Sequence, residues 1–372
     1  FNIFGEGVTA NASMRLNRQI FFDLYGLPGE SLVERYDSYS SASEQVTKAL
    51  EREVRLGLKS PPIMGLPGQP VLRVDLLNER DNRIAYSLDA LRLLSGIDFR
   101  PYSWLLAEIE PGFTITNLEC ADPSVDCGQD LDGNQNSRLR LDRGQRVGGN
   151  LGSQITVDFR NSPFNPSKGW SLQFGTEYAQ GYVQDQGSSQ ELYAFLRSES
   201  RLTGYIPIGE SVIALALWGG RIDVLDGEDA PIDQRFFLGG RQTLRGFFDD
   251  SIFPADACLN SEDRDGCLER VPINEENPST IPIVGGHSYV LAKSELRLKL
   301  NESLTLNSFL EAGNLWYRHP SVSNFELRLG LGTGLSYTTP VGPLAVSVGF
   351  NPFRKRQYYE SLYEFHISIG QF

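Results

Sequence analysis

The sequence predicts an all-β protein, a sixteen-stranded antiparallel transmembrane β-barrel, from three observations. Apolar and polar residues alternate with a period of two over stretches of about ten residues, as in a strand with one apolar and one polar face. The connections alternate between short turns and much longer links, which is typical of outer-membrane barrels. No window approaches ~18 uninterrupted apolar residues, so the sequence excludes a transmembrane helix but not a barrel, whose apolar residues occupy every second position.

The alternation is clearest in the C-terminal third of the chain. Over residues 325–337, leucine and aromatic residues alternate with charged residues, glycine and serine. Residues 290–300 and 344–350 repeat the pattern, and residues 155–159 carry it in the middle of the chain. Residues 211–223 are apolar on both parities, so the sequence leaves their facing open.

The expected strands are spread over the whole chain, and the alternation is weakest before Pro61. In chain order they cover residues 5–15, 17–27, 31–40, 46–59, 69–80, 83–97, 102–118, 149–160, 168–183, 189–206, 211–223, 286–300, 303–317, 325–338, 342–353 and 361–372.

The connections set the topology and the orientation. Links after even-numbered strands are mostly short and rich in proline or glycine, whereas two links after odd-numbered strands, 119–148 and 224–285, are long. In outer-membrane barrels the short turns are periplasmic and the long loops are extracellular. The sequence therefore predicts one barrel domain over residues 1–372, in the bacterial outer membrane, with both termini in the periplasm.

A soluble β-sandwich or propeller is the alternative fold class, because its strands also alternate. Soluble strands average about five or six residues, whereas many of those expected here run to ten or more. One face of the strand expected at 286–300 also carries a row of charges, which suits the wet lumen of a barrel. The row is Lys293, Glu295, Arg297 and Lys299.

Composition narrows the classes of function. The formal net charge of -13 argues against a nucleic-acid partner, because phosphate binding needs a basic face. The 372 residues include 21 Phe, 15 Tyr and 37 Gly, which suits strands, interfacial aromatic girdles and turns. No charged and apolar leader precedes the first expected strand, so we expect a mature or truncated chain.

Two close cysteine pairs, Cys120 with Cys127 and Cys258 with Cys267, lie in polar, Asp-rich segments. Close pairs in loops predict two disulfides in an oxidising compartment. A zinc site is disfavoured, because the pairs lack the usual ligand spacings.

The segment after Cys127 offers a calcium alternative. Asp130, Asp132 and Asn134 place oxygen ligands at alternate positions, as calcium loops do. However, Gln135 stands where an EF-hand loop requires glycine, and no glutamate follows at the last ligand position. We therefore expect a solvated acidic loop without a metal.

Enzymatic motifs are absent from the sequence. His287, His319 and His366 are scattered without metal-ligand spacing, and neither a Gly-x-Ser-x-Gly elbow nor a phosphate-binding loop occurs. The sequence predicts no catalytic residue, no cofactor and no enzymatic activity.

Several short motifs follow one another in the second half of the chain. Within the link 224–285, Gly239-Gly240 precedes Arg245-Gly246-Phe247. The others are residues 158–161 leading to 166–170, residues 309–316, residues 340–344 and the aromatic C-terminal residue Phe372. Through their order and spacing the chain resembles the BamA/TamA-type superfamily of outer-membrane assembly factors, which is related to two-partner secretion transporters. The resemblance covers residues 150–372 by motif and the N-terminal part only by strand count.

The resemblance implies that the sixth extracellular loop folds back into the barrel and carries Arg245, Gly246 and Phe247 at its tip. An arginine inside a barrel needs a carboxylate. The family supplies it in a Phe-x-Asp-x-Gly segment on strand thirteen, which corresponds here to residues 309–313 with Glu311 replacing Asp. Parity turns Glu311 toward the lumen, so we expect an Arg245–Glu311 pair. Glu326, also inward, is the alternative partner.

The other two tip residues carry separate expectations. Gly246 is expected to let the tip adopt a positive φ, and Phe247 is expected to pack against the inner wall. Alternatively, Arg245 merely anchors a plug, and its pairing is structural.

The barrel seam is the second candidate site. Closure requires the first strand to pair with the last. The last strand alternates only through Phe365, Ile367 and Ile369, before Gly370 breaks the pattern ahead of Phe372, which predicts a weak seam. The resemblance implies that the seam opens sideways, so that a client strand pairs with an exposed edge. A closed seam with a frayed terminus is the alternative.

The resemblance implies a protein insertase that assembles β-barrel proteins into the outer membrane. Its expected partners are unfolded outer-membrane β-barrel clients, the lipid bilayer and periplasmic or lipoprotein accessory subunits. Periplasmic POTRA modules precede the barrel in the family and are expected to be missing from this chain. The alternatives are a polypeptide secretion pore of the two-partner type and, in a different class, a diffusion porin.

Overall fold

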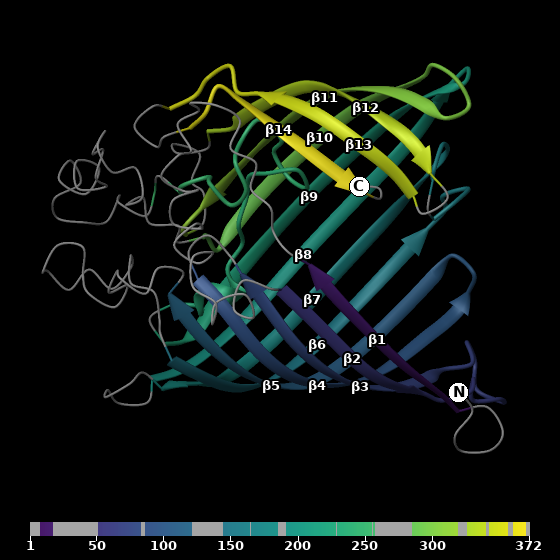
Figure 1. Ribbon diagram of the computed structural model, residues 1–372. Helices are drawn as coiled ribbons and strands as arrows, with labels where there is room; N and C mark the ends of the chain where they lie inside the picture. Colours follow the sequence, from purple (N-terminus) through teal and green to yellow (C-terminus); the bar gives the residue numbers. More distant parts are fainter. Residues whose placement is uncertain are drawn as a thin grey trace, which may run out of the picture.

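A computed structural model describes most of the chain, with gaps. The described residues are 8–17, 51–82, 86–120, 144–163, 165–184, 191–227, 229–254, 256, 285–318, 326–339, 342–355 and 360–369. Within them, fourteen strands form one antiparallel sheet in which each strand pairs with its neighbours in the chain (Figure 1). The strands are β1 (Thr9–Asn17), β2 (Glu51–Lys59), β3 (Val71–Asn82), β4 (Tyr86–Tyr102), β5 (Leu105–Cys120), β6 (Gly144–Asp158), β7 (Gly169–Gln184), β8 (Glu191–Ile208), β9 (Ser211–Asp226), β10 (Ser288–Lys299), β11 (Leu304–Trp316), β12 (Arg328–Thr339), β13 (Gly342–Phe350) and β14 (Tyr363–Ile369).

In the part of the chain that the structure describes, helical structure is limited to 3-10 conformation, in a turn at Ile232–Gln234 and at Asp256. No helix among these residues is both long enough and apolar enough to cross a membrane.

The all-β prediction is confirmed, and fourteen of the expected strands correspond to observed ones. The expected strands 17–27 and 31–40 lie almost wholly outside the described residues, so the total of sixteen stays a prediction. The strand expected at 149–160 begins earlier, at Gly144. Its first residues pair with residues 113–118 of β5, but they are mostly glycine and polar and carry no apolar alternation.

One face of the sheet is apolar across its width and the other is polar. In β3, Leu72, Val74 and Leu76 are exposed, while Asp75 between them is buried. Exposed apolar residues on other strands include Leu56, Leu93, Ile109, Leu151, Phe174, Leu202, Leu217, Leu310, Leu335, Val346 and Phe365. A soluble sandwich would cover this face with a second sheet, whereas a membrane barrel turns it toward hydrocarbon.

Side chains of residues 211–223, whose direction the sequence left open, also alternate between the apolar and the polar face. Leu215 and Leu217 are exposed, whereas Ala214 and Ile222 are buried. Odd-numbered residues of β9 therefore belong to the outer, apolar face.

The sheet curls about an interior (Figure 1). The strands β1–β5, drawn in purple and blue, lie opposite β10–β14, drawn in green and yellow. β1 pairs with β2 and β14 pairs with β13, and no pairing between described residues joins β1 to β14. The described part of the sheet is therefore open along one line, between its first and last strands.

Short and long connections leave opposite rims of the sheet. β4 and β5, β8 and β9, and β10 and β11 are joined by short turns at one rim, and the long links after β5 and β9 leave from the other. Aromatic rings line the short-turn rim: Tyr102 stacks on Trp104 with ring centroids 5.1 Å apart, and Phe159 lies 5.3 Å from Trp104 and 5.1 Å from Trp170. Exposed aromatic rows of this kind occur at membrane–water interfaces.

Candidate functional site

The link after β9 lies against the polar face of the sheet. We call its residues 229–254 the β9–β10 segment. Near its start, Ile232 is buried in a cluster with Leu88 of β4 and Leu118 of β5. The next residue, Asp233, forms an ion pair with Arg146 of β6. The segment is thus anchored on β4–β6 before it crosses to the C-terminal strands.

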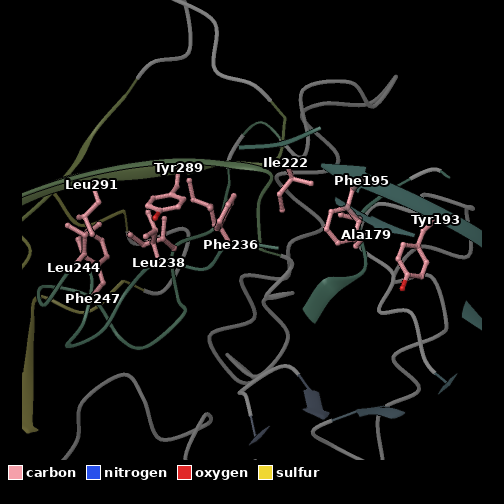
Figure 2. Close-up of a cluster of buried hydrophobic side chains, with 13 residues drawn as sticks. Ala179, Tyr193, Phe195, Ile222, Phe236, Leu238, Leu244, Phe247, Tyr289 and Leu291 are labelled. Carbon is pink, nitrogen blue, oxygen red and sulfur yellow. The ribbon is translucent and has the colours of Figure 1, made fainter. Parts of the chain in front are cut away.

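The middle of the segment supplies an apolar cluster (Figure 2). Phe236 meets the ring of Tyr289 on β10 edge-on, with centroids 4.7 Å apart, and the guanidinium of Arg197 lies 4.6 Å from the centroid of Phe236. The buried members from the segment are Ala230, Phe236, Leu238, Leu244, Phe247 and Ile252, and those from the strands are Ala179, Tyr193, Phe195, Ile222, Tyr289, Leu291 and Leu315. Phe247 therefore packs where the sequence predicted, against side chains of the sheet.

A tight turn built on Gly239 and Gly240 brings the chain to its tip. Their φ angles are 116° and 88°, in the region that glycine adopts without a steric penalty. The Gly240 N–H donates to the carbonyls of Leu244 at 3.1 Å and Phe247 at 3.0 Å. The Thr243 hydroxyl accepts from the Gly239 N–H at 2.9 Å and donates to the Gly239 carbonyl at 2.8 Å, which closes the turn.

Arg245 contacts Glu311, the partner predicted for it. The Arg245 side-chain Nε donates to Glu311 Oε1 at 2.7 Å, and the Arg245 backbone N–H donates to Glu311 Oε2 at 2.7 Å. The guanidinium carbon also lies 3.5 Å from the ring centroid of Phe309. Glu311 is 0% exposed, so water does not compensate its charge.

A second carboxylate, Glu295 of β10, completes a buried ionic network. Glu295 Oε2 accepts from Arg245 at 2.8 Å, and Glu295 Oε1 accepts from Arg297 Nε at 2.9 Å. Lys293 Nζ lies 3.5 Å from Glu311 Oε1 and donates to the backbone carbonyl of Gln242 at 2.9 Å. Every carboxylate oxygen of Glu295 and Glu311 contacts an N–H donor, so the network holds the tip in place.

Gly246 is required for a different reason than the sequence suggested. The expected positive φ is wrong, because Gly246 is not among the glycines with φ above zero. The need is close approach instead: a Cβ on Gly246 would lie 3.0 Å from the carbonyl oxygen of Phe350 and 3.1 Å from the Cα of Gly330. A Cβ on Gly349 would overlap the carbonyl oxygen of Arg245. The tip backbone thus lies in a slot that Gly330 of β12 and Gly349 of β13 leave open.

Glu326, the alternative partner of Arg245, does not contact it. Its carboxylate accepts from Lys355 Nζ at 2.8 Å and is 61% exposed. The Lys355 ammonium lowers the pKa of the Glu326 carboxyl. The prediction failed because Glu326 precedes β12, which begins at Arg328, so the parity of the strand does not govern its direction.

The predicted seam residues lie on a short last strand. β14 has seven residues and pairs with β13 from Tyr363↔Phe350 to Ile369↔Leu344. Phe365 and Ile367 are exposed on the outer face. Gly370 and Phe372 lie outside the described residues.

Several other predictions cannot be compared with the structure. Cys127, Cys258 and Cys267, and the calcium candidates Asp130, Asp132 and Asn134, lie outside the described residues. Cys120 ends β5, but its expected partner is not described. The disulfides therefore stay predictions.

Sequence reasoning identified the charged row on β10 but not its contact with the tip. The register places Lys293 opposite Glu311 and Glu295 opposite Phe309, so Glu295 is a diagonal neighbour of Glu311. The sequence feature that could have revealed the diagonal contact is the four-residue turn at 300–303, because this turn fixes the pairing of β10 with β11. His366, whose Nε2 lies 2.8 Å from the carbonyl oxygen of Arg245, had no signal in the sequence, because a loop backbone forms the contact.

Comparisons with known proteins agree with this architecture. The Omp85 superfamily domain model matches residues 106–372. The sorting and assembly machinery component 50 homolog of Mus musculus is 30% identical over 117 residues, which cover 31% of this chain and 24% of the mouse protein. The Homo sapiens homolog is 30% identical over 116 residues, with the same coverage. The match therefore spans about a quarter of the length of these relatives.

A solved structure shares the fold. BamA from Haemophilus ducreyi, crystallised without POTRA domains 1–3, matches with a TM-score of 0.63 at 17% identity, covering 86% of this chain and 62% of that one. Because both animal and bacterial proteins resemble the chain, the bacterial origin expected from the sequence stays a prediction.

Proposed function

The chain belongs to the Omp85 superfamily, and from this membership we propose that it assembles β-barrel proteins into an outer membrane. The apolar outer face of the sheet and the aromatic row at its short-turn rim support the membrane location. The animal relatives are named as components of a sorting and assembly machinery, which supports the assembly role.

The observation that carries the proposal is the β9–β10 segment fixed across the polar face. It contacts β4, β5 and β6 at one end and β10, β11 and β14 at the other. In the closed, sixteen-stranded barrel that we propose, this segment is the inward-folded sixth loop and occupies the lumen. An occupied lumen directs a client strand to the edge of the sheet, since the central route is obstructed.

The proposed mechanism uses the edges of the first and last strands. A client strand entering hydrocarbon unpaired leaves backbone groups unsatisfied, each at a cost of several kcal/mol. The short β14 offers an edge that can exchange its partner, so that client strands add to the sheet by β-augmentation. The driving force is the hydrogen bonding and burial of the client, and no catalytic chemistry is needed. We therefore propose a non-enzymatic insertase whose clients are unfolded β-barrel proteins, served by periplasmic or lipoprotein accessory subunits.

A polypeptide secretion pore is the second candidate, because the polar face keeps a cavity beside the segment. The cavity measures about 710 Å³ and is lined by β3–β8 residues that include Arg92, Glu110, Asn150, Gln173 and Arg197, together with Asp233 of the segment. A secreted client would have to displace Asp233 from Arg146 to pass through. This requirement makes the lumen the less favourable route.

Reconstitution separates these functions. The full chain in liposomes is given a urea-unfolded outer-membrane β-barrel protein, and client folding is followed by heat-modifiable electrophoretic mobility. We expect faster client folding than in protein-free liposomes, and only small, flickering currents in planar bilayers. A large steady current without any effect on client folding would point to a diffusion porin and overturn the proposal. Client accumulation inside the liposomes would identify a secretion pore.

A further inference from the structure

The backbone of Arg245 is bonded on both sides, to two different strands. Its N–H donates to Glu311 Oε2 of β11 at 2.7 Å, and its carbonyl oxygen lies 2.8 Å from His366 Nε2 of β14. A carbonyl oxygen only accepts, so His366 must carry a hydrogen on Nε2 and donate it. The backbone of one loop-tip residue therefore connects β11 to β14.

The strands between these two contacts leave room for the backbone of Arg245 and Gly246. Gly330 of β12 and Gly349 of β13 have no side chain, and the tip backbone at Arg245 and Gly246 occupies the space. The contact with His366 requires the tip backbone to lie this close to β12 and β13. A Cβ at Gly330 would lie close against the tip backbone, and a Cβ at Gly349 would collide with it.

β14 has few other attachments to the rest of the molecule. It pairs with β13 through seven residues, and Phe365 and Ile367 are exposed on the outer face. Of the side chains on its polar face, Glu364 accepts from Ser361 in its own turn, whereas His366 reaches the loop tip. His366 thus joins the tip to the last strand by a hydrogen bond.

We propose that His366 is a positioning residue that couples the loop tip to the last strand, so that displacement of the tip loosens β14 and retention of the tip fixes it. The coupling itself is independent of any client. Its consequence, control over the strand edge offered to a client, rests on the proposed function.

Hydrogen–deuterium exchange of the full chain in lipid nanodiscs, without client, tests the coupling. His366→Leu is expected to speed exchange of residues 363–369 and of the tip residues 243–248 by roughly fivefold, the change expected for one net hydrogen bond. His366→Gln retains an N–H donor and should restore slow exchange at both places. Ile367→Ala changes an outward-facing residue of the same strand and should leave the tip unaffected.

A second variant perturbs the loop tip instead of the last strand. Gly246→Ala changes the loop and leaves the His366 side chain in place. It should still speed exchange of residues 363–369, because its Cβ would lie close against β12 and β13 and displace the tip. The coupling is refuted if Gly246→Ala leaves β14 unchanged, or if His366→Gln behaves like His366→Leu. Client folding is then measured separately. Altered exchange without any assembly activity would preserve the coupling and remove the proposed function.

Discussion

Replacement of Glu311 by glutamine is expected to release the loop tip and destabilise the folded protein. Glu311 accepts two hydrogen bonds from Arg245 and lies 3.5 Å from Lys293 Nζ, with 0% of its surface exposed. The buried network holds the cations Arg245, Lys293 and Arg297 against the carboxylates Glu295 and Glu311. The substitution raises its excess of positive charge from one to two.

The magnitude follows from the burial of the pair. Removing one partner of a buried ion pair costs about 3–5 kcal/mol, because the remaining charge is left uncompensated. Glutamine keeps the shape and one carbonyl oxygen, which can still accept from the Arg245 backbone N–H. We therefore expect the lower end, about 3 kcal/mol, in the free energy of unfolding by urea in lipid vesicles, followed by tryptophan fluorescence.

Two controls decide whether the pair itself is responsible. Glu326→Gln removes a largely exposed carboxylate paired with Lys355 and should cost at most about 1 kcal/mol. Arg245→Met combined with Glu311→Gln should cost less than the sum of the single changes, by about 0.5–3 kcal/mol. If Glu311→Gln costs no more than Glu326→Gln, or if the double variant is additive, the network does not hold the tip and the reasoning is refuted.

Three further outcomes follow from the same contacts. Gly246→Ala should lower the urea-unfolding free energy by about 1–3 kcal/mol through overpacking against β12 and β13. An unchanged free energy would show that the slot left by Gly330 and Gly349 does not restrict the size of residue 246. Lys355→Met should raise the pKa of Glu326 toward its ordinary value in a carboxyl NMR titration. Because that pKa is lowered in the folded protein, the stability that the pair adds is present at neutral pH and is lost as the pH falls through the folded-state pKa, and this pH dependence should weaken in the variant. Asp233→Asn should free the start of the β9–β10 segment from Arg146 and speed amide exchange of residues 229–236 while residues 243–248 stay protected; equal acceleration at both places would contradict separate anchoring.

The strands were predictable because the two faces of each strand lie in different environments. Hydrocarbon outside and polar groups inside impose a period of two, and Leu72, Val74 and Leu76 display it as plainly in the sequence as in the structure. The start of β6 was not predictable, since glycine and glutamine fit either face. The Arg245–Glu311 contact was predictable from a motif and from the parity of β11, which the exposure of Leu310 beside buried Glu311 confirms.

The error at Gly246 and the omission of His366 have a common origin in contacts made by backbone rather than by side chains. Gly246 was assigned a positive φ because conformational freedom is the property of glycine that a single sequence suggests. Its actual role is to let two backbones approach, and that depends on Gly330 and Gly349, which lie far away in the sequence. The contact between His366 and the Arg245 carbonyl is invisible for the same reason.

The two ends of the β9–β10 segment are held by different chemistry, and this difference decides which end yields first. Near the start, Asp233 has one ion pair with Arg146, and Ile232 adds apolar contacts with β4 and β5. At the tip, Arg245 bonds to Glu295 and Glu311 through its side chain and is held by both groups of its backbone. The tip is therefore held by more hydrogen bonds and ion pairs than the start of the segment. A widening of the interior between β4–β6 and β10–β14 therefore strains the Asp233 end first, while the tip stays with the last strands.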